Sequence, residues 1–474
     1  HIMSSEKTSS CKVLFKELPS IDALYQILDI DSIAYPRDLI KNQLRKILNS
    51  IRKDIKLNKI SANIKEETIS RAKSSIALLT SFKLNQLING TGIVLHTGLG
   101  RSPLSKDLVS ESFDRIYPYS NLEFDVNKNS RGDRNDSIQD IINPLIGSQK
   151  AIVVNNCAAA LLLTLNTLSE HGEVIISRGQ QIEIGGSFRI PEVIKKSGSI
   201  IRDVGTTNKT HAVDYQNAIN PKSALILYAH TSNYRVVGFT NEIKISELSK
   251  ISRKNKIPLI VDAGSGCFAS FERFNMPLER ITKDYFKKGA DIVMFSGDKL
   301  LGGPQSGIIA GKKKYIDLIK KNPLYRALRV DKLTFSLLEG ILRTYKTDHS
   351  FYSNNLALEL LTRNRISLES FGDQILNKIS SKLIKKYNIR LIETMVEAGS
   401  GAMPINSIES IGIIFNSNKI SPNKLSQRFR SASIPVIGYI KDGNYIIDLK
   451  AIPLDSKDNI SKIISEVLSW KGKL

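Results

Sequence analysis

Short runs rich in isoleucine and valine alternate with helical stretches from about residue 86 onward, and this alternation most constrains the fold. Each run ends in a polar or glycine-containing turn. Continuous β-branched runs are typical of strands buried on both faces, and their alternation with helices predicts a largely parallel sheet covered by helices on both sides. The clearest runs are residues 151–154, 174–176, 224–228, 259–261 and 292–295.

Two further regions flank this alternating part. The residues before it have helical periodicity, and those after about 335 begin as helices and continue as short strands near 411–415 and 445–449. A chain of 474 residues with 41% hydrophobic residues is long enough for several cores. We therefore expect an α/β protein with three domains. They are a helical domain at 1–85, a domain with a mostly parallel central sheet at 86–335, and a smaller α+β domain at 336–474.

Unusual residues follow two of the predicted strands. The run 259–261 leads into Asp262 and a series of small residues, which let a flat ligand approach the carboxylate closely. The run 292–295 leads into Ser296 and, within a glycine-containing turn, Lys299. Ligands of parallel sheets bind at the carboxyl ends of the strands. A lysine at such an end can reach a carbonyl carbon, so Lys299 is a candidate for forming a Schiff base.

A lysine together with a carboxylate suits pyridoxal phosphate (PLP). The cofactor needs the lysine for its internal aldimine and the carboxylate for its ring nitrogen. Ser296 can donate to the cofactor phosphate. The run 151–154 leads into Asn156, Cys157 and Ala158, and small residues at a helix start present free N–H groups to an anion. Each turn alone is typical of ordinary α/β proteins. The order of cradle, carboxylate and lysine predicts a fold-type-I PLP enzyme.

The chain is strongly basic, with 68 lysines and arginines against 46 acidic residues and a formal net charge of +22. A field of this sign attracts polyanions, of which nucleic acid is the commonest. A lysine-rich composition throughout the chain is an alternative explanation. Residues 35–55 have the periodicity of an amphipathic helix with a basic stripe beside its apolar face, which is either a solvated surface or a phosphate contact. The stripe consists of Lys41, Arg45, Arg52 and Lys56.

Other classes of site are excluded by residue usage. The three cysteines, Cys11, Cys157 and Cys267, are widely spaced and odd in number, so we expect no disulfide framework and a reducing, cytoplasmic location. No cluster of cysteine and histidine has the spacing of a metal site, so no metal is expected. No apolar run reaches the roughly 18 residues that cross a bilayer, so no membrane contact is expected. Neither Cys157 nor Cys267 has an evident base beside it, which favours burial over a nucleophilic role.

Longer motifs narrow the class further. Together with the loop around Lys299, they resemble the bacterial selenocysteine synthases, the L-seryl-tRNA(Sec) selenium transferases, and the resemblance extends from residues 18–22 to the C-terminus. The motifs are NGTGIVLHTGLGR at 89–101, SNLEF at 120–124, RGDR at 131–134, EIGGSFR at 183–189, VGTTN at 204–208, HTSNY at 230–234 and NPLYRALRV at 322–330.

The resemblance implies conversion of seryl-tRNA(Sec) to selenocysteinyl-tRNA(Sec). The seryl amine would displace Lys299 to form a PLP external aldimine, and the same lysine would take the Cα proton. Loss of the β-hydroxyl would give an aminoacrylyl-tRNA, to which selenium from selenophosphate adds. The resemblance also implies that residues 1–85 bind tRNA and residues 86–335 bind PLP. The assembly it implies is a homo-oligomeric ring of dimers, with a decamer expected.

Site residues carried over from the resemblance include three arginines. Arg101, Arg326 and Arg329 match the family's active-site arginines, and guanidinium groups suit phosphate-like anions, so we assign all three to selenophosphate. Asp298, next to the lysine, is expected to orient groups in the site.

The HTSNY motif contains two further residues that are expected at the site. Three positions elsewhere in the chain differ from the family pattern. His230 either packs on the cofactor ring or is a structural histidine, and Ser232 is expected to bind the cofactor. The chain departs from the family pattern at Gly98, Gln180 and Tyr439, and what these changes do to substrate handling is left open.

Two alternatives remain at this stage. The first is a related PLP lyase or eliminase that acts on a free small amino acid or amino sugar, which would need no basic N-terminal domain. The second is a PLP-containing protein that binds tRNA without transferring selenium.

Overall fold

The computed structural model describes residues 13–184, 188–231, 234, 236–274, 276, 279–346, 351–403 and 407–470. The chain divides into two compact units, His1–Gln86 and Leu87–Leu474. In the described part, no helix is both long enough and apolar enough to cross a membrane.

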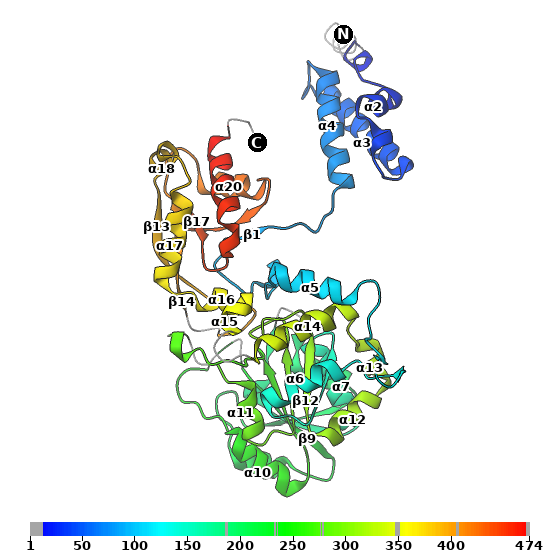
Figure 1. Ribbon diagram of the computed structural model, residues 1–474, viewed down its shortest axis with the longest axis vertical. Coiled ribbons are helices and arrows are strands. Elements are labelled where there is room, and N and C mark those ends of the chain that lie inside the picture. Colours follow the sequence, from blue (N-terminus) through cyan, green and yellow to red (C-terminus); the bar gives the residue numbers. More distant parts are fainter. Residues whose placement is uncertain are drawn as a thin grey trace, which may run out of the picture. The chain divides into compact units, whose positions relative to one another are not determined.

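The N-terminal unit is helical, as its periodicity predicts (Figure 1). The Ser20 hydroxyl caps helix α2 (Ile21–Ile27) by accepting a hydrogen bond from the backbone N–H of Ala23. The predicted amphipathic helix is present as α3, and its apolar face is buried with residues of α4 in one core. Its described helices include α2 (Ile21–Ile27), α3 (Arg37–Lys56) and α4 (Ile64–Thr80).

A seven-stranded sheet forms the centre of the second unit, with the strand order β4-β12-β11-β10-β9-β5-β8. All neighbours run parallel except β12, which is antiparallel to both β11 and β4. The mostly parallel sheet predicted from the β-branched runs is therefore confirmed. The strands are β4 (Lys150–Val154), β5 (Glu173–Ser177), β8 (Ile200–Val204), β9 (Ser223–Ala229), β10 (Leu259–Gly264), β11 (Ile292–Ser296) and β12 (Gly307–Gly311).

Helices cover both faces of this sheet because successive strand residues point to opposite sides. On β4, Val153 packs into the core beneath α6, α10, α11 and α14, whereas Ile152 and Val154 pack beneath α7, α8 and α12. Figure 1 shows helices of both groups, among them α6, α10 and α11 of the first and α7 and α12 of the second, around the central sheet. They are α6 (Asp136–Ile146), α7 (Cys157–Ser169), α8 (Ile190–Lys196), α10 (Ile245–Asn255), α11 (Thr282–Lys287), α12 (Lys313–Lys321) and α14 (Lys332–Thr344).

The C-terminal part of this unit contains an antiparallel sheet with the order β13-β14-β17-β16 and its own apolar core. The predicted strands near 411–415 and 445–449 are present as β14 and β17. β1 (Ile88–Asn89) pairs in parallel with β15 (Val436–Ile437). Other elements of this part include β13 (Ile389–Val396), β14 (Ile408–Phe415), β16 (Tyr439–Lys441), β17 (Asn444–Asp448), α17 (Arg365–Leu376), α18 (Ser381–Tyr387), α19 (Pro422–Arg430) and α20 (Lys457–Ser469).

The carboxyl ends of β4, β10 and β11 share one edge of the central sheet because the three strands are mutually parallel. β12 enters between β4 and β11 at this edge, where a Cβ on Gly307 would collide with the backbone oxygen of Asn156. Glycine is therefore needed for β12 to pass the start of α7. This close approach brings the turns predicted to carry chemistry together.

Candidate active site

A cavity of about 660 Å³ lies at this edge of the sheet. Its walls come from the segment after β1, the start of α7, the ends of β10 and β11, and the loop after β13. Eight residues predicted from the sequence to serve the site line it: Arg101, Asn156, Cys157, Ala158, Asp262, Ser296, Asp298 and Lys299.

Lys299 is almost fully buried, with 6% of its surface exposed. It lies in a turn that two backbone hydrogen bonds hold in place. Gly297 N donates to Ser306 O over 2.8 Å, and Leu300 N donates to Ser265 O over 3.0 Å. The lysine therefore enters the cavity from a rigid support rather than from a free loop.

Asp262, 7% exposed, lines the same cavity from the end of β10. Its Oδ1 accepts hydrogen bonds from Gly264 N over 3.1 Å and from the Cys157 thiol over 3.4 Å. Burial raises the pKa of this carboxyl, and the Cys157 thiol and the Lys299 charge oppose the rise. In the described part of the chain, both hydrogen bonds to this carboxylate reach Oδ1. The other oxygen, Oδ2, is therefore available to a cationic ligand.

The two cysteines described have different surroundings. Burial, and then the charge of Asp262, raise the pKa of the Cys157 thiol well above its usual value, so this thiol acts as a hydrogen-bond donor to the carboxylate. Burial raises the pKa of Cys267 to about 12, and its thiol donates to Ala269 O over 3.1 Å. Neither has the lowered pKa of a nucleophilic cysteine.

The start of α7 has the properties of an anion site. Asn156 is the N-cap, and its Oδ1 accepts a hydrogen bond from Ala159 N over 2.8 Å. The backbone N–H groups of Cys157 and Ala158 belong to the first turn and have no acceptor within the helix. They line the cavity at the positive end of a helix of 13 residues.

Arg101 and Asp298 face each other at the cavity, with 3.5 Å between Arg101 Nη1 and Asp298 Oδ2. Arg101 adopts a left-handed backbone conformation with φ of 62°, and its N–H donates to His96 O over 3.0 Å. Burial raises the pKa of Asp298, and the arginine opposes this rise. The carboxylate thus holds the guanidinium at the cavity wall.

The other two predicted arginines do not join Arg101 within one chain. Arg326 is exposed on α13 (Pro323–Leu328). Arg329 lies beside Glu123, with 3.3 Å between Nη1 and Oε1, and it does not line the cavity of Lys299. Within one chain, Arg101 therefore lines this cavity and the two arginines of the 322–330 motif do not, and the assignment of all three to selenophosphate stays a prediction.

Three guanidinium groups surround the carboxylate of Glu123. Arg131 Nη2 is 2.7 Å from Oε2, and Arg134 and Arg329 both contact Oε1. The hydrogen bond from Arg134 is the largest cause that lowers the pKa of Glu123. Arg134 also donates to Val330 O over 3.0 Å and so ties the β2–β3 hairpin (Phe124–Asp125 and Ser130–Arg131) to the residue after Arg329. This cluster carries more positive than negative charge.

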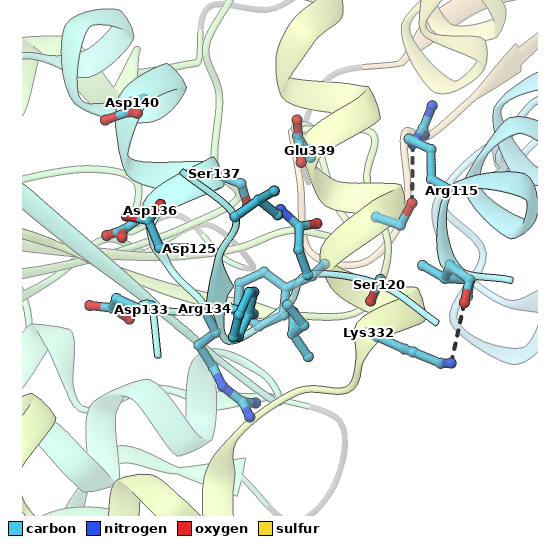
Figure 2. Close-up of a pocket in the computed structure, with 18 of the residues that line it drawn as sticks. Arg115, Ser120, Asp125, Asp133, Arg134, Asp136, Ser137, Asp140, Lys332 and Glu339 are labelled. Carbon is cyan, nitrogen blue, oxygen red and sulfur yellow. Dashed lines mark hydrogen bonds between the residues drawn. The ribbon is translucent and has the colours of Figure 1, made fainter. Parts of the chain in front are cut away.

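A second cavity of about 490 Å³ lies next to this cluster, and Figure 2 shows it. Arg134 and Asp133 reach it from the RGDR motif, and Lys332 and Glu339 from α14. Residues of the SNLEF motif also line it. The RGDR and SNLEF motifs, for which the sequence analysis predicted no role, therefore line the same cavity.

His230 and Ser232 were predicted to bind the cofactor. His230 lies beside the cavity but does not line it, and its Nε2 is 3.2 Å from Oε1 of the buried Glu279. Its backbone N–H donates to Asp262 O over 2.9 Å. Glu279 also accepts a hydrogen bond from Ser265 Oγ over 2.9 Å. Ser232 lies outside the described residues.

The three departures from the family pattern lie away from the cavity lining. Gln180 is buried; its Oε1 accepts from Ala229 N and its Nε2 donates to Glu242 Oε1, each over 3.2 Å. Gly98 N donates to His96 Nδ1 over 3.1 Å within a 3₁₀ turn. Tyr439 begins β16, and burial raises its pKa to about 12.

The sequence did not predict the wall formed by residues 397–402 or the buried Glu279. The only sequence signal for the former is a glycine-rich segment following a strand, which is common to many loops.

Comparisons with known proteins agree with this geometry. Residues 87–453, more than half of the chain, match the family described as "SelA: L-seryl-tRNA selenium transferase". The L-seryl-tRNA(Sec) selenium transferase of Caldanaerobacter subterraneus subsp. tengcongensis is 42% identical over 456 residues, which cover 96% of this chain and 98% of that relative. The Geobacter sulfurreducens protein of the same name is 36% identical over 467 residues, covering 96% and 100%.

Among solved structures, D-glucosaminate-6-phosphate ammonia-lyase is similar in fold, with a TM-score of 0.57 and 18% identity over 83% of this chain and 98% of that chain. The predicted fold class, a fold-type-I PLP-dependent transferase with N-terminal helices and a small C-terminal α+β part, is confirmed. The fold and the family imply PLP as the cofactor. The chain belongs to the L-seryl-tRNA(Sec) selenium transferase family, the selenocysteine synthases that convert seryl-tRNA(Sec) to selenocysteinyl-tRNA(Sec).

Proposed function

We propose that the cavity of Lys299 holds PLP and is where serine on tRNA(Sec) becomes selenocysteine, with selenophosphate as the selenium donor. One observation carries this proposal. A buried lysine and a buried carboxylate with one oxygen available line the same cavity as the start of a 13-residue helix.

The residues present fit PLP. Lys299 would hold the aldehyde carbon, and the available oxygen of Asp262 would hold the protonated ring nitrogen. The N–H groups of Cys157 and Ala158, with the hydroxyl of Ser296, suit the phosphate. When bound, PLP withdraws electrons from the α-carbon of an amino acid, which lets an α-proton and a β-substituent leave.

The chain's own residues then supply proton transfer and orientation. Lys299 Nζ would take the proton from the serine α-carbon. The Cys157 thiol, held protonated by its raised pKa, donates to Oδ1 of Asp262 and would leave the other oxygen of this carboxylate for the ring nitrogen. Asp298 orients Arg101, whose guanidinium suits a phosphate-like group.

For selenophosphate, Arg101 of one chain would act with Arg326 and Arg329 of a second copy. This arrangement is supported by the position of the latter two outside their own chain's cavity. It requires a homo-oligomer, and a ring of dimers such as a decamer satisfies it. Arg326 is exposed on α13 and is therefore accessible to a neighbouring copy.

The N-terminal unit would bind the tRNA. Arg45, Arg52 and Lys56, three members of the basic stripe, line a cavity of about 720 Å³ on this unit. Phosphate contacts from such residues would make binding fall with salt concentration. Removing residues 1–86 is expected to weaken tRNA(Sec) binding and leave PLP bound, because the two units have separate cores.

The test is a direct analysis of the amino acid on the tRNA. Purified protein with PLP and selenophosphate would be given serine-charged tRNA(Sec) and, separately, serine-charged ordinary serine tRNA. Mass spectrometry should find selenocysteine on the first tRNA only. Serine left unchanged on both, with PLP bound, would overturn the proposal and favour a lyase that acts on free small molecules.

A further inference from the structure

The loop after β13 forms the wall of the Lys299 cavity that comes from the C-terminal part of the unit. Leu95 N donates to Ala398 O over 2.8 Å, and Ser400 Oγ donates to Leu95 O over 2.6 Å. Gly399 has a φ of +95°, and a Cβ there would lie 2.8 Å from Leu95 O. The loop is therefore held tightly against the segment that carries Arg101.

Glu397 is the charged residue of this wall. It lies between Val396 and Ala398, which are both buried, and its own side chain is exposed and lines the cavity. In the described part of the chain, no ion pair joins it to a lysine or arginine. The backbone of this residue is thus fixed while its carboxylate remains available at the cavity.

The charges on one chain's cavity walls disfavour a free amino acid, and the two arginines proposed to come from a second copy are assigned to selenophosphate. The described lining residues of one chain include three carboxylates, from Asp262, Asp298 and Glu397, and two cations, from Arg101 and Lys299. Arg101 faces Asp298, and Lys299 is committed to the cofactor in the proposed function. No unpaired cation of these walls is left for an α-carboxylate, whereas an unpaired hydrogen-bond acceptor is present.

Serine on tRNA differs from free serine in two chemical respects. Its carboxyl group is an ester and carries no charge. The terminal ribose that bears the ester also has a neighbouring hydroxyl group, which is a hydrogen-bond donor. A carboxylate at the cavity accepts a hydrogen bond from that hydroxyl and repels a free carboxylate.

Resting on the proposed function, we propose that Glu397 determines specificity for the ribose ester of serine. Its carboxylate accepts a hydrogen bond from the free hydroxyl beside the ester and excludes free amino acids by charge. No bond is made or broken by this residue, so it acts in substrate binding.

The first test compares two forms of serine-charged tRNA(Sec), one ending in adenosine and one in 2′-deoxyadenosine, with the wild-type enzyme. Loss of the hydroxyl should lower kcat/KM for selenocysteine formation by about tenfold or more, the size of one hydrogen bond to a charged acceptor. Glu397→Ala should cause a similar loss with the ribose form and little further loss with the deoxy form, because both changes remove the same interaction.

A second arm measures free L-serine, by its effect on the absorbance of bound PLP and by pyruvate release. Glu397→Gln and Glu397→Ala should bind free serine several-fold more tightly than the wild type, since the repelling charge is gone. Glu393→Ala is the matched control, because Glu393 is an exposed acidic residue on β13 that pairs with Arg365 and does not line the cavity. This control variant should leave unchanged both the ratio of kcat/KM between the two tRNA forms and the binding of free serine.

Equal kcat/KM for the two tRNA forms in the wild type would overturn the role of the hydroxyl without any variant. An equal loss by Glu397→Ala on both forms, with free serine binding unchanged, would mark Glu397 as structural and also overturn the inference. A wild-type enzyme that forms no selenocysteine on tRNA(Sec) would instead refute the proposed function, and this inference with it.

Discussion

The second unit buries a lysine and an aspartate in two different places. We call Lys299 and Asp262 the cavity pair, and Asp448 and Lys450, at the end of β17, the sheet pair. All four side chains are at most 7% exposed. Burial of such groups is costly unless hydrogen bonds or charges compensate, so the two pairs differ in what compensates them.

The sheet pair is satisfied by the protein itself. The Asp448 carboxylate accepts hydrogen bonds from Thr394 Oγ1 and Ser410 Oγ, each over 2.6 Å, and from Lys450 N over 3.0 Å. The ammonium group of Lys450 donates to two backbone oxygens, over 2.6 and 3.1 Å. These hydrogen bonds hold β13, β14 and β17 together from within.

The cavity pair is only partly satisfied. Both hydrogen bonds described to Asp262 reach a single oxygen, and Lys299 lines a cavity. The comparison shows that burial and residue type do not distinguish a structural pair from a functional one. The distinguishing feature is whether donors and acceptors are left available to a ligand.

The largest expected effect comes from replacing each of the two buried lysines by alanine. Lys299→Ala should lower selenocysteine formation by at least about a thousandfold and leave the free energy of unfolding nearly unchanged. Lys450→Ala should leave PLP binding intact and lower the free energy of unfolding by about 3 kcal/mol, because two backbone carbonyl oxygens lose their donor and the buried Asp448 carboxylate loses a nearby positive charge. Single-turnover kinetics and urea unfolding measure the two effects. Large losses of both stability and activity in both variants would contradict the distinction between a functional cavity pair and a structural sheet pair.

The aspartates should differ in the same way. Asp262→Asn should reduce turnover by about a hundredfold or more, because an amide does not keep the ring nitrogen protonated. The variant should still fold. Asp448→Asn should retain turnover and lose about 1–3 kcal/mol of stability through its broken hydrogen bonds. Full activity of Asp262→Asn with bound PLP would show that the Asp262 carboxylate is not needed for the reaction.

The pH dependence of the free energy of unfolding should test the protonation of Lys450 in the sheet pair. Burial lowers the pKa of Lys450 to about 8 from 10.5. Between these values the folded state binds fewer protons than the unfolded state, so this lysine makes stability rise with pH across that window. Urea unfolding at pH 7.5, 9 and 10 should show a smaller rise in Lys450→Met than in the wild type. Identical pH profiles would show that this lysine is not titrated as described.

The smallest expected effect concerns Glu123, which orients Arg329. Glu123→Gln should raise the KM for selenophosphate by about two- to fivefold with a smaller change in kcat, the size expected of a partly exposed ion pair. Glu339→Gln is a suitable control, since Glu339 lines the neighbouring cavity and pairs with Arg343 on its own helix. A change in kcat alone would argue against a role in binding the selenium donor.

Local patterns predicted much of this fold and site. The β-branched runs identify the central strands, and the positions of Asp262 at the end of β10 and Lys299 just after β11 follow from the rule for parallel sheets. β13 was not predicted, because its half-exposed residues, including Arg390 and Glu393, lack the continuous apolar pattern of the central strands.

The parts that the sequence did not predict depend on contacts between distant segments. Glu397 reaches the cavity only because its loop packs on Leu95, about 300 positions earlier, and Glu279 is defined by its contact with His230. The separation of Arg329 from Arg101 likewise depends on how α13 packs. Neither a sequence motif nor a hydrophobic periodicity predicts which distant segments of the chain come into contact.

The most direct test of the distinction between the two pairs is to find where PLP attaches. The wild-type protein would be incubated with PLP, reduced with borohydride, digested and analysed by mass spectrometry. The pyridoxyl group is expected on Lys299 and absent from Lys450 and from the remaining lysines, and it should disappear from the digest of Lys299→Ala. A stoichiometric pyridoxyl group on another lysine, with Lys299 unmodified, would contradict the assignment of the cavity pair.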